Sequence, residues 1–186
     1  MHTQYLALVL LGRAVLLAAA PLKFRAALDK RDNLAIIETA LAPVFGALSA
    51  VDLATVSLDG TPAAANQLAA ASEEAQAAVN EATIIVRATG DLTVAKSLKL
   101  RKSTETLASQ TKTTLDDLVS RKPILDQLGV SSVALTSLEQ QEAATMSLSD
   151  ALTQKIPSIG QSEAASDKSE MEAMFNKAIA VYAVSA

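Results

Sequence analysis

"DDLVSRKPILDQLGVSSVALTSL", residues 116–138, joins two long runs of helix-forming residues. Pro123 follows two cations in this stretch, and Gly129 follows an apolar segment. Proline disfavours helical geometry at the residue before it, and glycine accepts the left-handed turn that ends many helices. The stretch therefore predicts a corner between two helices, the first of which ends at Lys122.

The remaining residues of this corner fit the same interpretation. Arg121 and Lys122 are cations at the expected carboxyl end of a helix, where positive charge is favoured. A serine directly after the turn, Ser131 or Ser132, is suited to cap the next helix. The apolar residues between proline and glycine are expected to form a short turn that closes one end of a bundle: Ile124, Leu125 and Leu128.

Apolar residues recur every three or four positions through most of the chain, which is the period of an amphipathic helix. Hydrophobic residues make up 50% of the sequence but aromatic residues only 3%, and this composition favours helices over a β-sandwich. On the helix at 94–121, the same period places Val94 and Leu98 on the inner face. The predicted fold is an all-α, up-and-down bundle of about five helices. The expected helices are 33–57, 62–89, 94–121, 132–156 and 163–183.

The segment "YLALVLLGRAVLLAAA", residues 5–20, is apolar and ends in small residues. It is too short to span a bilayer, and we interpret residues 1–19 as a signal peptide. The alternative is a first helix that is buried or lies on a membrane, and Arg13 is the residue that favours it. Residues 20–31 end in Lys30-Arg31, either a propeptide cleavage site or a pair of surface charges. Residues 32–184 are expected to form a single domain.

The charge of the expected domain argues against a nucleic-acid partner. The chain has 16 basic and 20 acidic residues. Residues 1–31 contain five of the basic residues and one acidic residue, so 11 basic and 19 acidic residues remain, a net charge of −8. Proteins that bind nucleic acid depend on basic contacts to phosphate. The densest basic segment is "KSLKLRK" at 96–102, which is either a solvated helix face or a contact for an anionic group.

The sequence lacks the residues that most enzymes need. It has no cysteine, and its one histidine is His2, inside the expected signal peptide. A Ser-His or Cys-His dyad and a histidine-containing metal site are therefore excluded from the expected domain. No cofactor-binding or metal-binding motif is present, so we expect no cofactor, no metal and no catalytic residue. A carboxylate-only hydrolase is the remaining enzymatic alternative, with acid pairs at Glu73-Glu74, Asp116-Asp117 and Glu139/Glu142.

Several inner positions carry small or mildly polar residues. The helix at 62–89 has alanines where a tight core would have leucines, and the helix at 94–121 has Thr104 and Thr111 in line with Leu107. One interpretation is close helix packing, which alanine permits. The other is an apolar tunnel for a ligand, in which flexible methionines adapt to a variable guest.

The order and spacing of three segments resemble the fungal hydrophobic surface-binding protein A family, also called cell-wall galactomannoproteins. The segments are "DNLAIIETALAPVFGALSAVD" (32–52), "ATGDLTVAKSL" (88–98) and "DDLVSRKPILDQLGVSSVALTSLEQQEAATMSLSDALTQKIP" (116–157). The resemblance implies a non-enzymatic helical bundle with an internal apolar cavity or tunnel. It also implies a secreted, extracellular or wall-associated protein that holds fatty acids or similar lipids or adsorbs to hydrophobic surfaces. The alternative within this family is a structural, surface-coating protein without a ligand pocket.

The partners that the resemblance implies are a long-chain fatty acid or other lipid, hydrophobic surfaces, and cell-wall polysaccharide or secreted hydrolases. No transmembrane segment is expected in this domain. The chain has no Ser/Thr/Pro-rich stalk and no lipid-anchor tail, which favours a freely secreted form. Thr111 is the expected contact for a polar head group. Helical phase gives the expected apolar lining as Leu68, Val79, Ile85, Leu107, Leu115, Leu118, Leu135, Leu138, Met146, Leu152, Met174, Phe175 and Ile179.

Overall fold

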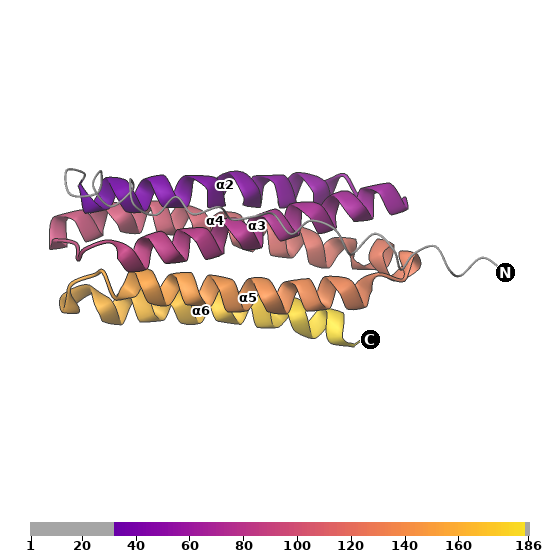
Figure 1. Cartoon of the computed structure of the whole chain (residues 1–186). Coiled ribbons are helices and arrows are strands. Elements are labelled where there is room, and N and C mark those ends of the chain that lie inside the picture. Colours follow the sequence, from indigo (N-terminus) through magenta and orange to yellow (C-terminus); the bar gives the residue numbers. More distant parts are fainter. Residues whose placement is uncertain (1–31, 185–186) are drawn as a thin grey trace. The chain divides into compact units, whose positions relative to one another are not determined.

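A computed structural model describes residues 32–184. The expected signal peptide and the segment at 20–31 lie outside the described residues. Five helices make up the described range, which confirms an all-α bundle (Figure 1). They are α2 (Asn33–Val56), α3 (Pro62–Ala88), α4 (Val94–Leu128), α5 (Ser131–Thr153) and α6 (Ser158–Ala183).

Side-chain caps define the starts of the first two helices. The side chain of Asp32 accepts a hydrogen bond of 3.0 Å from the Leu34 amide at the start of α2. The side chain of Thr61 accepts one of 3.3 Å from the Ala64 amide at the start of α3. Each oxygen satisfies an amide that has no partner within its own helix.

The helices form a ring in which neighbours in space are not always neighbours in sequence. Close contacts join α2 to α3, α3 to α5, α5 to α6, α6 to α4 and α4 back to α2, whereas α4 and α5 touch only sparsely. Helices α2 and α4 run parallel, because Lys96 pairs with Asp32 near both starts and Arg121 donates to the Val56 carbonyl near the far end of α2. A ring of five helices surrounds a central space that side chains must fill.

Two hydrophobic clusters fill most of this space. The first cluster lies toward the start of α2, and its side chains come from α2, α3 and α5, with Leu92 from a connection and Leu100 from α4. The second cluster lies toward the other end and includes Leu115, Leu118, Phe175 and the fully buried Tyr182.

Helix α2 is long and apolar enough to cross a membrane by composition. Its apolar side chains form much of the first cluster, which identifies it as a core helix.

The opening corner differs from its prediction at Pro123. Helix α4 does not end at Lys122 but continues to Leu128, with Pro123 inside it. A proline removes one amide donor from the helix, at a cost of about 3 kcal/mol. Burial of Leu125, which is 2% exposed in the second cluster, and packing of Ile124 against that cluster offset this cost. The apolar residues expected in a turn are therefore the last turn of α4.

Gly129 ends α4 as predicted, and the next helix starts without the predicted serine cap. Gly129 has φ +70°, its amide donates to the Asp126 carbonyl, and the Val130 amide donates to the Leu125 carbonyl, both at 3.0 Å. This is the paired-bond arrangement of a Schellman motif. Val130 occupies the N-cap position of α5. The Ser131 hydroxyl instead donates to the Asp126 carboxylate. The hydrogen bonds from Lys122 and, to a smaller extent, from Ser131 lower the pKa of Asp126.

Helix α6 begins five residues earlier than predicted, at Ser158 rather than at 163. Pro157 and Gly160 favoured a break over 157–162, but Pro157 stands at the N-cap, where a missing amide costs nothing. A Cβ atom on Gly160 would lie 2.9 Å from Cγ2 of Ile156, so glycine permits the close first turn.

Two further predictions about this end of the bundle are wrong: Val94 and Leu98 are not core residues but are 52% and 65% exposed.

Candidate functional site: a pocket between α4, α5 and α6

A pocket of about 460 Å³ lies inside the ring, between the first half of α4, the second half of α5 and the first half of α6. Side chains of α2 and α3, among them Leu48 and Val79, form its floor. The α4 residues that line it extend from Val94 to Thr111. At 1.5 Å of rise per residue, that stretch of helix is roughly 25 Å long. The pocket is therefore elongated along the bundle.

The sequence explains why this part of the ring is not filled. Residues 102–114 of α4 read "KSTETLASQTKTT", and Leu107 is their one large apolar residue. Residues 158–170 of α6 read "SIGQSEAASDKSE", in which the one large apolar residue is Ile159, 82% exposed. The first buried residue of α6 is Met171. Since Leu107 is the one large side chain from these two segments that packs against the first cluster, a space remains between them and α5.

Most of the interior lining is apolar. Leu48, Leu100 and Leu148 are buried residues of the first cluster that also line the pocket. Met171 and Met174 line it from α6. Methionine has an unbranched, polarisable side chain that adapts to irregular guests. An apolar compartment with flexible methionines on one wall is suited to an alkyl chain.

Charged residues line the outer side of the pocket, and its cations are already paired. Arg101 of α4 contacts Glu163 of α6 at 2.5 Å and Glu105 at 2.9 Å. The Glu163 carboxylate raises the pKa of the Arg101 guanidinium above its ordinary value. Lys168 contacts Asp150 of α5 at 2.6 Å. Four acidic residues line the pocket against these two cations, so the lining carries a net negative charge: Glu105, Glu163, Asp167 and Glu170.

Hydroxyl groups supply the other polar atoms of the lining. Thr111 is 5% exposed, and its hydroxyl donates to the Leu107 carbonyl at 2.9 Å. The hydroxyls of Thr104 and Thr153 likewise donate to carbonyls of their own helices, both about one turn earlier. A hydroxyl that donates to the backbone still has lone pairs that accept hydrogen bonds. The pocket therefore offers acceptors for a ligand group that carries a hydrogen.

The residues predicted as a site are divided between this pocket and the core. Five of them line the pocket: Val79, Leu107, Thr111, Leu152 and Met174. Ile85 packs against the first cluster. The other eight belong to the second cluster or pack against it: Leu68, Leu115, Leu118, Leu135, Leu138, Met146, Phe175 and Ile179. Leu115 and Met174 also line a second cavity of about 280 Å³ between α4 and α6.

The sequence does not single out the charged lining or the first turn of α6. Arg101 lies in a basic segment, and Ile159 lies where a helix break is expected. The signal that identifies the pocket is the pair of segments poor in large apolar residues, 102–114 and 158–170. Each segment alone is an ordinary polar helix, and only the ring order places them beside the same compartment.

The acid pairs noted in the sequence lie outside the pocket lining. Glu73 and Glu74 are exposed, and Asp116 is paired with Lys112 at 2.6 Å. Burial raises the pKa of Glu142, with smaller contributions from Glu172 and Glu139. Within residues 32–184, no three acidic or histidine side chains cluster in a way that would hold a metal ion.

Comparisons with solved structures identify bundles of the same fold. One is Afmp4p in complex with palmitic acid, with 26% identity, a TM-score of 0.77, and coverage of 81% of this chain and 99% of that one. Another is ligand binding domain 1 of the Penicillium marneffei MP1 protein complexed with arachidonic acids, with 18% identity, a TM-score of 0.77 and the same coverage. Ligand binding domain 2 of that protein, complexed with multiple arachidonic acids, has 20% identity and a TM-score of 0.76, and the match covers 83% of this chain and 97% of that one.

A search of curated proteins found no match. A family model described as Hydrophobic surface binding protein A matches residues 34–154, which include α2, α3, α4 and α5. That range is well over half of the chain and contains most of the pocket lining outside α6. This chain therefore belongs to the Hydrophobic surface binding protein A family.

Proposed function

We propose that this protein is a secreted, non-enzymatic binding protein that holds a long-chain fatty acid or a similar lipid in the pocket between α4, α5 and α6. The observation that carries the proposal is the elongated apolar pocket of about 460 Å³ within the ring. This volume falls within the range of about 300–1,000 Å³ that is usual for small-molecule sites. Afmp4p, which shares the fold at 26% identity, was solved with palmitic acid.

Burial of the alkyl chain would supply most of the affinity. Each methylene removed from water contributes about 0.8 kcal/mol before the costs of association. Leucine side chains from α2, α4 and α5 and two methionines from α6 provide the contact surface. Longer saturated chains should therefore bind more tightly until the pocket is full.

We propose that Thr111 contacts the polar head of the ligand, and that the head is bound uncharged. A carboxylate at the outer side of the pocket would face Glu105, Glu163, Asp167 and Glu170, while both cations there are engaged. The Thr111 hydroxyl donates to Leu107 and can accept a hydrogen bond from a protonated carboxyl or an alcohol. Burial away from water also favours the neutral form of a carboxylic acid. Affinity for a fatty acid should then rise as the pH falls, and Thr111→Val should weaken it.

Titration of the delipidated, secreted protein with a fluorescent fatty acid tests this function. The proposal predicts saturable binding that unlabelled palmitate displaces. Absence of saturable binding would contradict it. Mass measurement of the secreted protein tests the accompanying proposals on processing, namely removal of residues 1–19 and cleavage after Arg31.

A second candidate function is coating of hydrophobic surfaces without a dedicated ligand, in which the protein recruits secreted hydrolases or joins wall polysaccharide. The exposed side chains of Leu53, Ile84 and Val133, each more than 60% accessible, favour it, as does the family. It predicts depletion of the protein from solution by hydrophobic beads, with a change in helicity on adsorption. Retention in solution would exclude it. Adsorption with no fatty-acid binding would favour it over the lipid carrier.

A further inference from the structure

The outer end of the pocket opens onto a group of apolar side chains that solvent reaches. Val94, Leu98 and Ile159 line the pocket and are 52%, 65% and 82% exposed. Ile156 and Pro157 line it beside them and are partly exposed. We name these five residues the mouth patch. Exposed apolar groups gathered at one place mark interaction sites, whereas single ones are ordinary.

The mouth patch is continuous with the interior of the pocket. Leu98 and Ile159 come from different helices, α4 and α6, which the ion pair between Arg101 and Glu163 holds together. The next lining residues inward on α4 are Leu100, Arg101 and Thr104. A surface that covers the mouth patch would therefore also face the pocket entrance.

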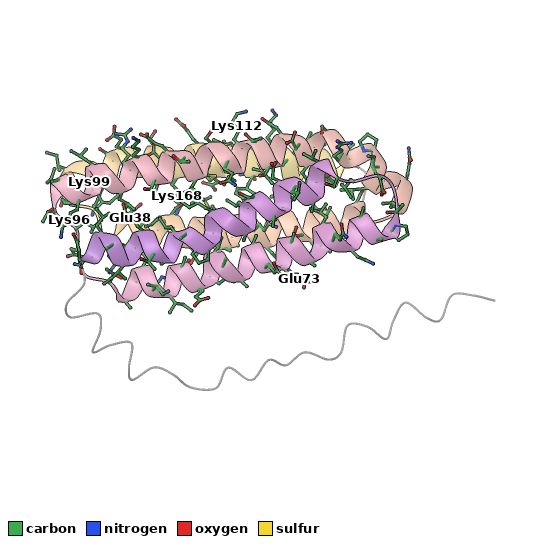
Figure 2. The ribbon with its side chains drawn as sticks, turned by 90° about the horizontal axis from the view of Figure 1, so that it is seen from above. Glu38, Glu73, Lys96, Lys99, Lys112 and Lys168 are labelled. Atoms are coloured by element: carbon green, nitrogen blue, oxygen red, sulfur yellow. The ribbon has the colours of Figure 1, made fainter. Side chains whose placement is uncertain are left out.

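Four cations of α4 lie beside the mouth patch, and the carboxylates of Glu105 and Glu163 lie beside it, paired with Arg101. Residues 94–102 contain four basic residues and no acid, in a domain whose net charge is −8 from residue 32 onward. Lys96 is paired with Asp32, and Arg101 is paired within the pocket lining. Lys99 and Lys102 are exposed, and no ion pair of theirs is found among residues 32–184. Figure 2 shows Lys96 and Lys99 at the same end of the bundle. Lys102 lies one helical turn after Leu98 and so shares its face.

We propose that the mouth patch, together with Lys99 and Lys102, docks on an anionic phospholipid bilayer. Apolar side chains that enter the interface, flanked by lysines that meet acidic head groups, are the combination that holds proteins on such membranes. A stable protein partner usually takes about 20–30 residues from each side, many more than the five of the mouth patch. The docking is inferred from this surface alone. If the protein also carries lipid, as proposed above, docking would let the pocket load and unload directly at a membrane.

Co-sedimentation of the secreted protein with vesicles tests the docking. The vesicles are pure phosphatidylcholine, or phosphatidylcholine mixed with phosphatidylglycerol. The proposal predicts binding to the mixed vesicles that weakens with added salt, and little binding to the neutral ones. Lys99→Glu with Lys102→Glu should weaken binding about tenfold or more, because each lysine near an anionic surface contributes strongly. Binding that is equal on both vesicle types, or absent from the anionic type, would overturn the proposal.

A matched pair of variants separates the mouth patch from general hydrophobicity. Leu98→Ser with Ile159→Ser removes two apolar side chains from the patch. Leu53→Ser with Ile84→Ser removes two that are 68% and 69% exposed and do not line the pocket. Only the first pair should lose vesicle binding. An equal loss in both pairs, or no loss in the first, would contradict docking through the mouth patch.

Fatty-acid titration of the Lys99→Glu, Lys102→Glu variant without vesicles separates this inference from the proposed function. Neither lysine lines the pocket, so the affinity of this variant for the fatty acid should equal that of the unaltered protein. Failure of vesicle binding together with normal titration would reject the docking alone. Vesicle binding together with failed titration of the unaltered protein would reject the lipid carrier and leave the docking standing.

Discussion

Arg101 of α4 and Glu163 of α6 form an ion pair of 2.5 Å that joins two helices across the pocket. Glu163 lies in the half of α6 that contributes no buried large side chain, so few apolar contacts hold this half in place. This ion pair and the contact of Lys168 with Asp150 link this half of α6 to α4 and α5. We therefore expect the first half of α6 to be the wall of the pocket that opens most readily.

Replacement of Glu163 by glutamine should loosen this wall without unfolding the protein. Both partners are more than one third exposed, so the free energy of unfolding should change by less than about 1 kcal/mol. Amide hydrogen exchange should rise in residues 158–170 and stay unchanged in α2. Asp116→Asn is the control, because it breaks an ion pair of 2.6 Å that lies within α4 alone. The same exchange in residues 158–170 for both variants would show that the contact with Arg101 does not hold the wall.

Two glycines with open space around them should respond to alanine in opposite directions. Gly129 has φ +70°, a conformation that costs an L-residue about 1–2 kcal/mol. Gly46 lies inside α2, where alanine is favoured by roughly 0.5–1 kcal/mol. No neighbouring atom lies within 4 Å of an added Cβ at either position. Denaturant unfolding should show Gly129→Ala to be less stable than the unaltered protein and Gly46→Ala to be more stable. Equal shifts would contradict the left-handed corner.

Tyr182 should make the stability of the protein fall at high pH. Its hydroxyl is fully buried and donates to the Leu118 carbonyl at 2.7 Å. Burial, with a smaller contribution from Asp126, raises the pKa of this phenol above its ordinary value of 10.0. The unfolded chain therefore loses the proton first, and the free energy of unfolding decreases as the pH rises above about 10.

The variant Tyr182→Phe isolates this effect. It should be less stable by about 1 kcal/mol at neutral pH, because the buried hydrogen bond is lost. Its stability should decline less steeply above pH 10 than that of the unaltered protein. Parallel declines in the two proteins would mean that Tyr182 ionises freely. Tyr5 and Tyr182 are the two tyrosines of the sequence, so removal of the signal peptide leaves Tyr182 as a single reporter in absorbance titration.

The helices and most corners could be predicted because their signals are local. The period of the apolar residues identified five helices, and Thr61 and Gly129 marked corners through their own backbone and side-chain preferences. The continuation of α4 through Pro123 could not be predicted this way. It depends on the burial of Leu125 against residues distant in the sequence.

The pocket was only partly predictable, for the same reason. Helical phase gives the direction of a side chain but not the partner opposite it. Leu107 and Thr111 line the pocket, whereas Leu118, three turns after Leu107 on the same helix, packs in the second cluster. The difference arises from what lies opposite: the first half of α6 buries no large side chain, whereas its second half supplies Phe175 and Tyr182, and α6 lies beside α4 only because of the ring order. Sequence spacing carries no information on that order.

The most direct test of the central claim is the affinity of two matched variants for a fluorescent fatty acid. Ala108→Phe places a ring in the pocket, because Ala108 lines it between Leu107 and Thr111. Ala77→Phe adds the same ring to an exposed position of α3. If the pocket between α4, α5 and α6 holds the acyl chain, Ala108→Phe loses saturable binding while Ala77→Phe binds like the unaltered protein. Binding by Ala108→Phe with undiminished affinity would contradict the claim.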